Sequence, residues 1–185
     1  MGRITLVLGG IKSGKTAFAE NIALERENQG GKIVYLATAK PLDEEMSDRI
    51  KKHQSIRPST WDTIEESLDI KPIIKNTSET HDLILMDCLT LWITNKIVEA
   101  GEDYIRKDLM EEILSNADEF LEEIKKRNID LIIVSNQAEA GLVSAYKMGR
   151  LFQDLAGLLH QKIGKEADLV VLMQAGFPTL LKGAL

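Results

Sequence analysis

Cysteine and long apolar runs are scarce in this chain of 185 residues. Its single cysteine, Cys88, excludes an intrachain disulfide and fits a reducing compartment. No apolar run reaches the roughly 20 residues that a bilayer-spanning helix needs, and no basic-then-apolar leader precedes the first apolar segment. We therefore expect a cytoplasmic protein without a membrane span.

Long clusters of positive charge are missing as well. The formal net charge is -6 and the pI is about 5.2. The short basic stretches at residues 51–52 and 125–127 lie beside acidic residues, which is typical of solvated helix faces. Because nucleic-acid binding needs a continuous basic track, we expect no nucleic-acid partner.

A glycine-rich turn near the start of the chain follows an apolar run and precedes a helical pattern. It has the spacing GxxxxGKT and consists of Gly9, Gly10, Ile11, Lys12, Ser13, Gly14, Lys15 and Thr16. In such a turn the backbone N–H groups cradle phosphate oxygens at the helix N-terminus. Lys15 can reach the outer phosphates, and the Thr16 hydroxyl can ligate Mg²⁺. Glycine-rich turns also occur for packing alone, but the Lys-Thr ending favours nucleoside triphosphate binding.

The rest of the chain alternates between short apolar runs and helical patterns. The predicted strands are residues 4–8, 33–37, 83–86, 131–135 and 169–173. Continuous apolar runs indicate strands that are buried on both faces of a parallel sheet. The predicted apolar helix faces are Leu109, Ile113, Ala117, Phe120, Leu121 and Ile124, and Met148, Leu151, Leu155, Leu158, Leu159 and Ile163. The sequence predicts one α/β domain over residues 1–185, with a RecA-like P-loop NTPase fold and helices on both faces of a mostly parallel sheet.

Two strand ends carry residues that suit chemistry. Asp87 ends an apolar run in the manner of a Walker B strand, whose carboxylate holds Mg²⁺. The alternative is an ordinary helix-capping Asp, since a helix could begin near Thr90. Ser135, Asn136 and Gln137 end another run, and ligands of such sheets bind beyond the carboxyl ends of strands. We therefore expect these three residues in the cleft.

One histidine lies in a helical pattern. Met46, Ile50 and His53 follow the spacing i, i+4 and i+7, which places them on one face. From spacing alone a packed or surface histidine is the more common outcome. His81 and His160 belong to no zinc-binding spacing and are expected to be structural or surface residues.

The chain resembles the bifunctional adenosylcobinamide kinase/adenosylcobinamide-phosphate guanylyltransferase family. The matching segments are residues 8–16 with 19–20, 35–39, 43–50 with His53, 57–58 with Trp61, 87–92 with 94–95, 134–136, and 152–154 with Gly157. The block from Ala37 to Trp61 and the string DCLTLW at residues 87–92 are far more specific than a bare P-loop, which many families share.

The resemblance implies two reactions at one nucleotide site. The hydroxyl of adenosylcobinamide would take the γ-phosphate of ATP or GTP, and GMP from GTP would then be transferred to the product through a guanylyl-histidine. His53 matches the histidine of the family, with Lys15 and Asp87 as further catalytic residues and Thr16 and Asp87 as Mg²⁺ ligands. Arg49, one helical turn from His53, either binds a phosphate or braces the helix. The resemblance also implies a homotrimer.

Departures from the family pattern lie in the C-terminal half. Where the family has an acid after Ser-Asn, this chain has Gln137. Where the family has an Arg-Asp pair and an Asn-Gln pair, this chain has Gln153-Asp154 and His160-Gln161. Glu139 is a candidate replacement for the missing acid. Three functions therefore stay open: the bifunctional enzyme, an enzyme with one of the two activities, and a P-loop regulator that binds nucleotide without phosphorylating a small molecule.

Overall fold

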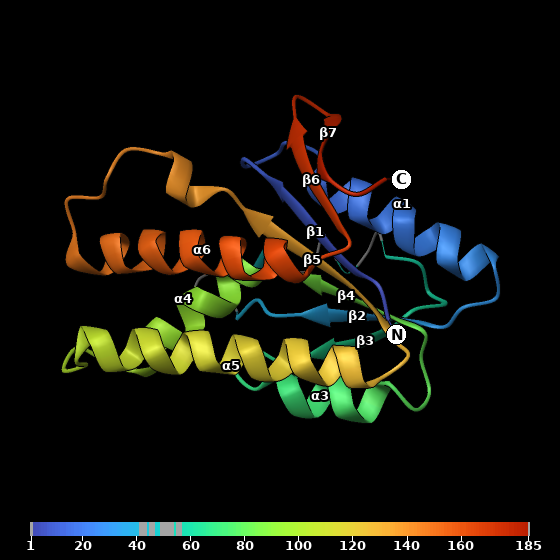
Figure 1. Cartoon of the computed structure of the whole chain (residues 1–185), viewed down its shortest axis with the longest axis horizontal. Helices are drawn as coiled ribbons and strands as arrows, with labels where there is room; N and C mark the ends of the chain where they lie inside the picture. The colour runs from blue at the N-terminus through green and yellow to red at the C-terminus, as the bar shows by residue number, and fades with distance from the viewer. Residues whose placement is uncertain (1, 41–43, 45–46, 49–53, 55–56, 185) are drawn as a thin grey trace.

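The computed structural model describes residues 2–40, 44, 47–48, 54 and 57–184. Its helices and strands in chain order are β1 (Ile4–Gly9), α1 (Lys15–Asn28), β2 (Ile33–Ala37), β3 (Asp62–Glu65), α3 (Ile70–Thr77), β4 (Leu83–Asp87), α4 (Leu89–Glu99), α5 (Arg106–Lys126), β5 (Asp130–Asn136), the 3-10 helix η1 (Ala138–Ala140), α6 (Lys147–Glu166), β6 (Leu169–Gln174) and β7 (Phe177–Lys182) (Figure 1).

The strands form one sheet in the order β3-β2-β4-β5-β1-β6-β7. All neighbouring strands are parallel except β6 and β7, which form an antiparallel hairpin. The five predicted strands are confirmed, each with ends within one residue of the prediction. β5 separates β1 from β4, as in RecA-like P-loop folds. The fold prediction is therefore correct.

The two strands at the edges of the sheet, β3 and β7, were not predicted. All six residues of β7 are exposed, and so are three of the four residues of β3. Without burial on both faces, neither strand needs the continuous apolar run by which the central strands are recognised. The β6–β7 turn is made by Ala175 and Gly176, both with positive φ.

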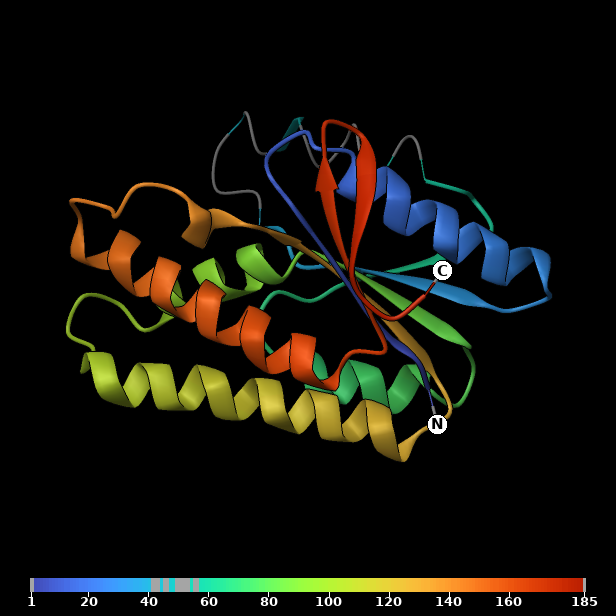
Figure 2. The ribbon, with the colours of Figure 1, turned by 45° about the horizontal axis from the view of Figure 1, so that its top comes forward.

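Successive residues of each central strand face opposite layers of the molecule. In β1, Leu6 and Leu8 pack with the helices α3, α4, α5 and α6, while Val7 between them packs on the side of α1. The small residues Ala19 and Ala23 are the fully buried positions by which α1 meets the sheet. Figures 1 and 2 show α1 apart from the other helices, on its own side of the sheet.

The predicted face of α5 is confirmed, because all six of its residues are buried. The predicted face of α6 is wrong at Met148 and Leu158, which are 54 % and 40 % exposed. The buried stripe of α6 runs through Leu151, Leu155, Leu159 and Ile163 and includes Ala156 and His160. Among the residues that the structure describes, no helix has the length and apolar character needed to cross a bilayer.

Candidate functional site

The loop between β1 and α1 is folded tightly at the carboxyl edge of the sheet. A Cβ atom at Gly9 would collide with the Ser13 hydroxyl and lie 2.8 Å from the Met173 carbonyl oxygen. Gly14 has a φ of 95°, in the left-handed region that favours glycine. These two glycines are therefore required by close approach and by backbone conformation, as the GxxxxGKT spacing predicts.

Lys15 begins α1 and folds back over the loop. Its Nζ donates to the Gly10 carbonyl oxygen at 2.9 Å. Burial lowers the pKa of the Lys15 ammonium, and the nearby Cys88 and Asp87 partly oppose that shift. The side chain is only 8 % exposed, so its charge is held within the loop, at the place where phosphate groups would be cradled.

Asp87 ends β4 and joins two other elements of the site. Its Oδ2 accepts hydrogen bonds from the Tyr35 hydroxyl of β2 at 2.6 Å and from the Thr16 hydroxyl of α1 at 3.4 Å. The structure thus brings Thr16 and Asp87 together, as the two motifs predict, although they are far apart in the chain. A hydroxyl and a carboxylate are suitable Mg²⁺ ligands.

Two oxygen ligands fit the way Mg²⁺ is usually held in phosphoryl-transfer sites. The ion keeps several waters and takes further ligands from the substrate phosphates. Among the described residues, no group of three or more His, Cys, Asp or Glu side chains could hold a metal ion by itself. The donor set at Thr16 and Asp87 therefore fits an ion that arrives with a nucleotide.

Tyr35 and Arg57 are residues of the site that motif reasoning did not assign a role. The Tyr35 ring is 1 % exposed, and burial together with the neighbouring Asp87 carboxylate raises the pKa of its hydroxyl far above the usual range. The Arg57 guanidinium carbon lies 3.7 Å from the centroid of that ring. Arg57 Nε and Nη1 are buried without a hydrogen-bond partner, so this cation has unused donors beside Tyr35. In the sequence, the signal that could have pointed to Tyr35 was a tyrosine within an otherwise aliphatic strand.

Glu20 adds a further carboxyl group to this cluster. Burial is the main cause that raises the pKa of Glu20, the Asp87 charge adds to it, and Arg57 opposes it. Glu20, Tyr35, Arg57 and Asp87 therefore form one electrostatically coupled group next to Lys15.

The remaining motif residues near Asp87 hold the strand ends in place. Thr38 Oγ1 accepts the Cys88 N–H and donates to the Cys88 carbonyl oxygen, both at 2.8 Å. Asn95 Nδ2 donates to the Thr38 carbonyl oxygen at 2.7 Å. Burial raises the pKa of the Cys88 thiol to about 11, so the thiol stays neutral near pH 7 and is a poor nucleophile. Trp92 packs edge-on against Phe120, with ring centroids 5.9 Å apart. These parts of the motifs are structural.

The expectation that Ser135 lines the cleft is wrong. Ser135 is 0 % exposed, and its hydroxyl lies 2.7 Å from His160 Nε2. His160 Nδ1 lies 2.8 Å from Glu139 Oε1, which makes a chain of serine, histidine and carboxylate. Because the serine is buried, this chain is no hydrolase triad. The expectation that His160 is structural is confirmed.

Asn136 and Gln137 lie closer to the phosphate loop. Asn136 is the register partner of Gly9 in the β1–β5 pair, and its side chain donates to the Thr90 hydroxyl at 3.1 Å. The Gln137 N–H donates to the Gly9 carbonyl oxygen at 3.0 Å. The segment after β5 is therefore bonded to the start of the phosphate loop.

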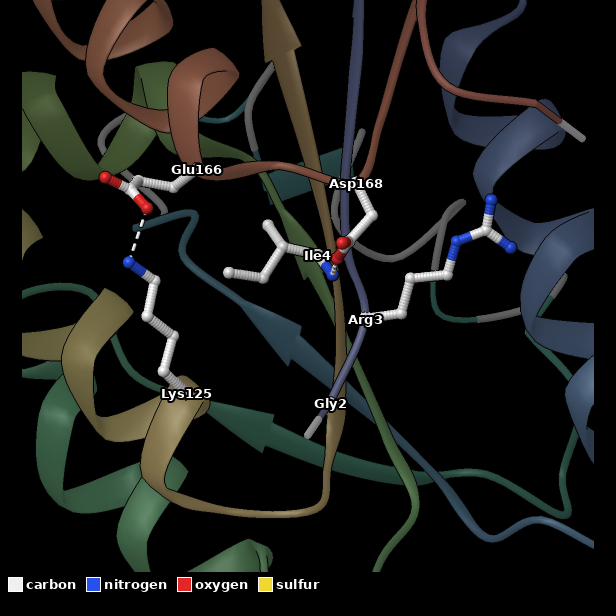
Figure 3. Close-up of a pocket in the computed structure, with 6 residues that line it drawn as sticks. All are labelled: Gly2, Arg3, Ile4, Lys125, Glu166 and Asp168. Atoms are coloured by element: carbon white, nitrogen blue, oxygen red, sulfur yellow. Dashed lines mark hydrogen bonds and ion pairs between the residues drawn. The ribbon is translucent and has the colours of Figure 1, made fainter.

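A hollow of about 270 Å³ lies at the opposite edge of the sheet, beside the start of β1 (Figure 3). Asp168 Oδ2 accepts the Ile4 N–H at 2.8 Å, and Lys125 forms an ion pair with Glu166. Figure 3 shows these side chains at the junction of α5, α6 and β1. Their polar groups are satisfied by one another, so we assign this hollow a structural role.

Two predicted site residues, His53 and Arg49, lie outside the described residues. Their roles therefore stay predictions. Of the predicted residues that are described, Lys15, Thr16 and Asp87 meet at one end of the sheet, and Gly14 of the loop has a positive φ.

Comparisons with known proteins identify a family to which the chain is similar. The sequence model of a family described as cobinamide kinase / cobinamide phosphate guanyltransferase matches residues 5–181. The chain is 39 % identical over 178 residues to the bifunctional adenosylcobalamin biosynthesis protein CobP of Pseudomonas aeruginosa, covering 96 % of both chains. It is 26 % identical over 182 residues to the bifunctional adenosylcobalamin biosynthesis protein CobU of Escherichia coli, covering 96 % of this chain and 98 % of the relative.

A solved structure supports the fold. The flagellar accessory protein FlaH of Methanocaldococcus jannaschii aligns with a TM-score of 0.52 and 16 % identity, over 98 % of this chain and 79 % of that chain. At this identity the likeness shows the fold alone.

Proposed function

Because the chain belongs to the cobinamide kinase / cobinamide phosphate guanyltransferase family, we propose that it phosphorylates adenosylcobinamide with ATP or GTP and then transfers GMP from GTP to give adenosylcobinamide-GDP. We assign both reactions to one domain over residues 1–185 and place them in the cytoplasm. The observation that carries the proposal is the meeting of Lys15, Thr16 and Asp87 at the phosphate loop.

In the kinase step, the hydroxyl oxygen of the aminopropanol arm attacks the γ-phosphorus. The new oxygen–phosphorus bond forms as the bond to the β–γ bridging oxygen breaks, the hydroxyl proton is released, and the nucleoside diphosphate leaves. Lys15 and the N–H groups of the loop stabilise negative charge on the phosphates. Thr16 and Asp87 would hold Mg²⁺, which neutralises phosphate charge when it is bound.

In the guanylyl step, we assign the nucleophile to His53. A ring nitrogen attacks the α-phosphorus of GTP and pyrophosphate leaves, so that GMP is held as a phosphoramidate. A phosphate oxygen of adenosylcobinamide phosphate then attacks the same phosphorus and frees the histidine. The covalent intermediate divides one displacement into two easier ones. We include Arg49 among the residues that bind the nucleotide phosphates.

The residues that depart from the family pattern are well bonded in the structure, which supports retention of both activities. Gln153 uses its amide to accept the Ser144 N–H at 2.9 Å and to donate to the Leu142 carbonyl oxygen at 2.9 Å. Glu139 and His160 pair with each other at 2.8 Å. We infer that Glu139, two residues later, stands in for the acid that Gln137 lacks.

We also propose a homotrimer. A closed ring needs two different surface patches on each subunit, because its contacts are heterologous. The exposed apolar side chains of the described surface include Leu142 and Tyr146 near η1, and Phe177 and Leu181 on β7. A molar mass of three chains by light scattering supports the ring, and a fully active single chain would contradict it.

The intact mass of the protein tests the guanylyl step. The wild type incubated with GTP and Mg²⁺, with pyrophosphate removed, should gain the mass of one GMP. The His53→Ala variant should gain none, whereas the matched histidine control His81→Ala should be modified like the wild type. An adduct on His53→Ala would contradict the assigned nucleophile.

Release of ADP or GDP tests the kinase step. Release should require cobinamide. Nucleotide turnover without cobinamide would instead favour a P-loop regulator that does not phosphorylate a small molecule.

A further inference from the structure

A groove of about 760 Å³ opens between the segment before α5, the loop around η1 and the start of α6. Its charged lining residues are Glu102, Arg106, Glu139, Lys147, Arg150 and Asp154. None of them belongs to the phosphate-binding residues described above.

The wall of the groove is joined to the phosphate loop through the backbone. One of its walls is η1, which begins one residue after Gln137, whose N–H donates to the Gly9 carbonyl oxygen at 3.0 Å. Figures 1 and 2 both show η1 beside the end of β1, at the carboxyl edge of the sheet. A backbone hydrogen bond at the carboxyl edge of the sheet therefore connects the segment that leads into the groove wall with the phosphate loop.

The wall of the groove is held in shape by side chains of α6. Gln153 binds three backbone groups, at Ala138, Leu142 and Ser144. Arg150 Nη1 donates to the carbonyl oxygens of Ser144 and Ala145 at 3.0 and 2.8 Å. A wall fixed in this way loses little conformational entropy when a ligand binds.

Other polar groups of the groove have unused hydrogen-bonding capacity. Glu139 Oε2 is buried without a partner, although Oε1 of the same carboxylate is bonded to His160. Within the described part of the chain, Lys147 and Glu102 also line the groove without a hydrogen bond or ion pair. A buried acceptor without a donor is costly, so a donor supplied by a ligand would be favoured.

The charges of the groove balance. Three cations and three carboxylates line it, which gives a formal charge of zero. A site for phosphate groups would carry an excess of cations, as the phosphate loop does with Lys15. A balanced set of donors and acceptors instead suits neutral dipolar groups such as primary carboxamides, which both donate and accept.

We propose that this groove binds the carboxamide side chains at the edge of the corrinoid acceptor and so directs its hydroxyl toward the phosphate loop. The proposal rests on the proposed function, because cobinamide carries acetamide and propionamide groups around its ring. In the bound state, a carboxamide N–H donates to Glu139 Oε2, and Lys147 donates to a carboxamide oxygen.

Glu139→Gln and Lys147→Ala test this assignment. Glu139→Gln keeps an acceptor for His160 and turns the unpaired acceptor into a donor, while Lys147→Ala removes an exposed donor. We expect the KM for cobinamide to rise by about tenfold for Glu139→Gln and by about three- to tenfold for Lys147→Ala. The affinity for a fluorescent ATP analogue, measured without cobinamide, should stay within about twofold of the wild type for both.

Lys107→Ala is the matched control, because Lys107 lies next to Arg106 on α5 but does not line the groove. Its KM for cobinamide should equal that of the wild type. Unchanged cobinamide KM values in both groove variants, or a loss of ATP affinity instead, would overturn this inference alone. A wild type without cobinamide-dependent turnover would overturn the proposed function and this inference with it.

Discussion

The loops after β1 and β5 lie side by side but are held in place differently. The loop after β1 is fixed mainly by its own residues, through the φ of Gly14 and the bond from Lys15 to the Gly10 carbonyl oxygen. The Gln137 and Gly176 N–H groups add one backbone bond each, to Gly9 and Ser13. The loop after β5 is fixed from α6, by Gln153 and by His160, which lie 15 and more residues further along the chain. The first is mostly a local structure and the second a tertiary one.

This difference sets what a substitution can do at each loop. A change in the phosphate loop should remove chemistry and leave the fold intact, because its geometry is set within a few residues. A change in α6 should act on the loop after β5 through broken support, and so should affect stability and acceptor binding together. The predictions below test this division, beginning with the largest effect.

Lys15→Ala should lower cobinamide-dependent turnover by about two to three orders of magnitude, because it removes a preorganised positive charge from the transferring phosphate. The melting temperature should change little, since the loop keeps its glycines. Steady-state kinetics and thermal unfolding, measured with Lys107→Ala as the exposed lysine control, test both statements. A large loss of stability would show that the phosphate loop is not a purely local structure.

His160→Ala should lower the free energy of unfolding by about 3 kcal/mol, because it leaves the buried Ser135 hydroxyl and Glu139 carboxylate without partners. Denaturant unfolding measures this change. His160→Asn, the residue found in the family pattern, should recover part of it.

His81→Ala is the matched control for that loss. His81 Nε2 also lies 2.8 Å from a carboxylate, but its partner Asp62 is 77 % exposed. We expect a loss of no more than about 1 kcal/mol for this variant. If both variants lost the same free energy of unfolding, the contacts of His160 with the loop after β5 would stabilise the protein no more than the contact of His81 with an exposed carboxylate does.

The same difference explains what could be predicted from the sequence. The five central strands and the Lys15, Thr16 and Asp87 site depend on contiguous patterns, so they could be predicted. The exposure of Met148 and Leu158, the burial of Ser135 and the groove depend on how α6 lies against the sheet. No spacing along the chain encodes that packing, and the polar edge strands β3 and β7 lack a buried face by which to recognise them.

Tyr35→Phe tests whether the nucleotide end also needs support from distant residues. The Tyr35 hydroxyl donates to Asp87 Oδ2 at 2.6 Å and so orients the proposed Mg²⁺ ligand. Loss of such an outer-sphere hydrogen bond typically costs about 10- to 100-fold in metal affinity, and we expect the lower end of that range. The Mg²⁺ concentration for half-maximal turnover measures it. An unchanged value would sharpen the contrast between the loops, because the site would then depend on its motifs alone.

The smallest effect concerns Cys88, which follows Asp87 at the end of β4. Its thiol has a pKa of about 11 in the folded protein against 9.0 as the ordinary value, because burial favours the neutral form. Between these two pH values the Cys88 thiol is deprotonated in the unfolded chain but still protonated in the folded protein. The free energy of unfolding therefore falls as the pH rises, by about 1.4 kcal/mol at pH 10 relative to pH 7. Cys88→Ala should lack this part of the alkaline loss, which denaturant unfolding of both proteins at pH 7 and pH 10 measures. An equal loss in both would mean that water reaches the thiol, and that the strand end beside the phosphate loop is less tightly closed than its Thr38 hydrogen bonds indicate.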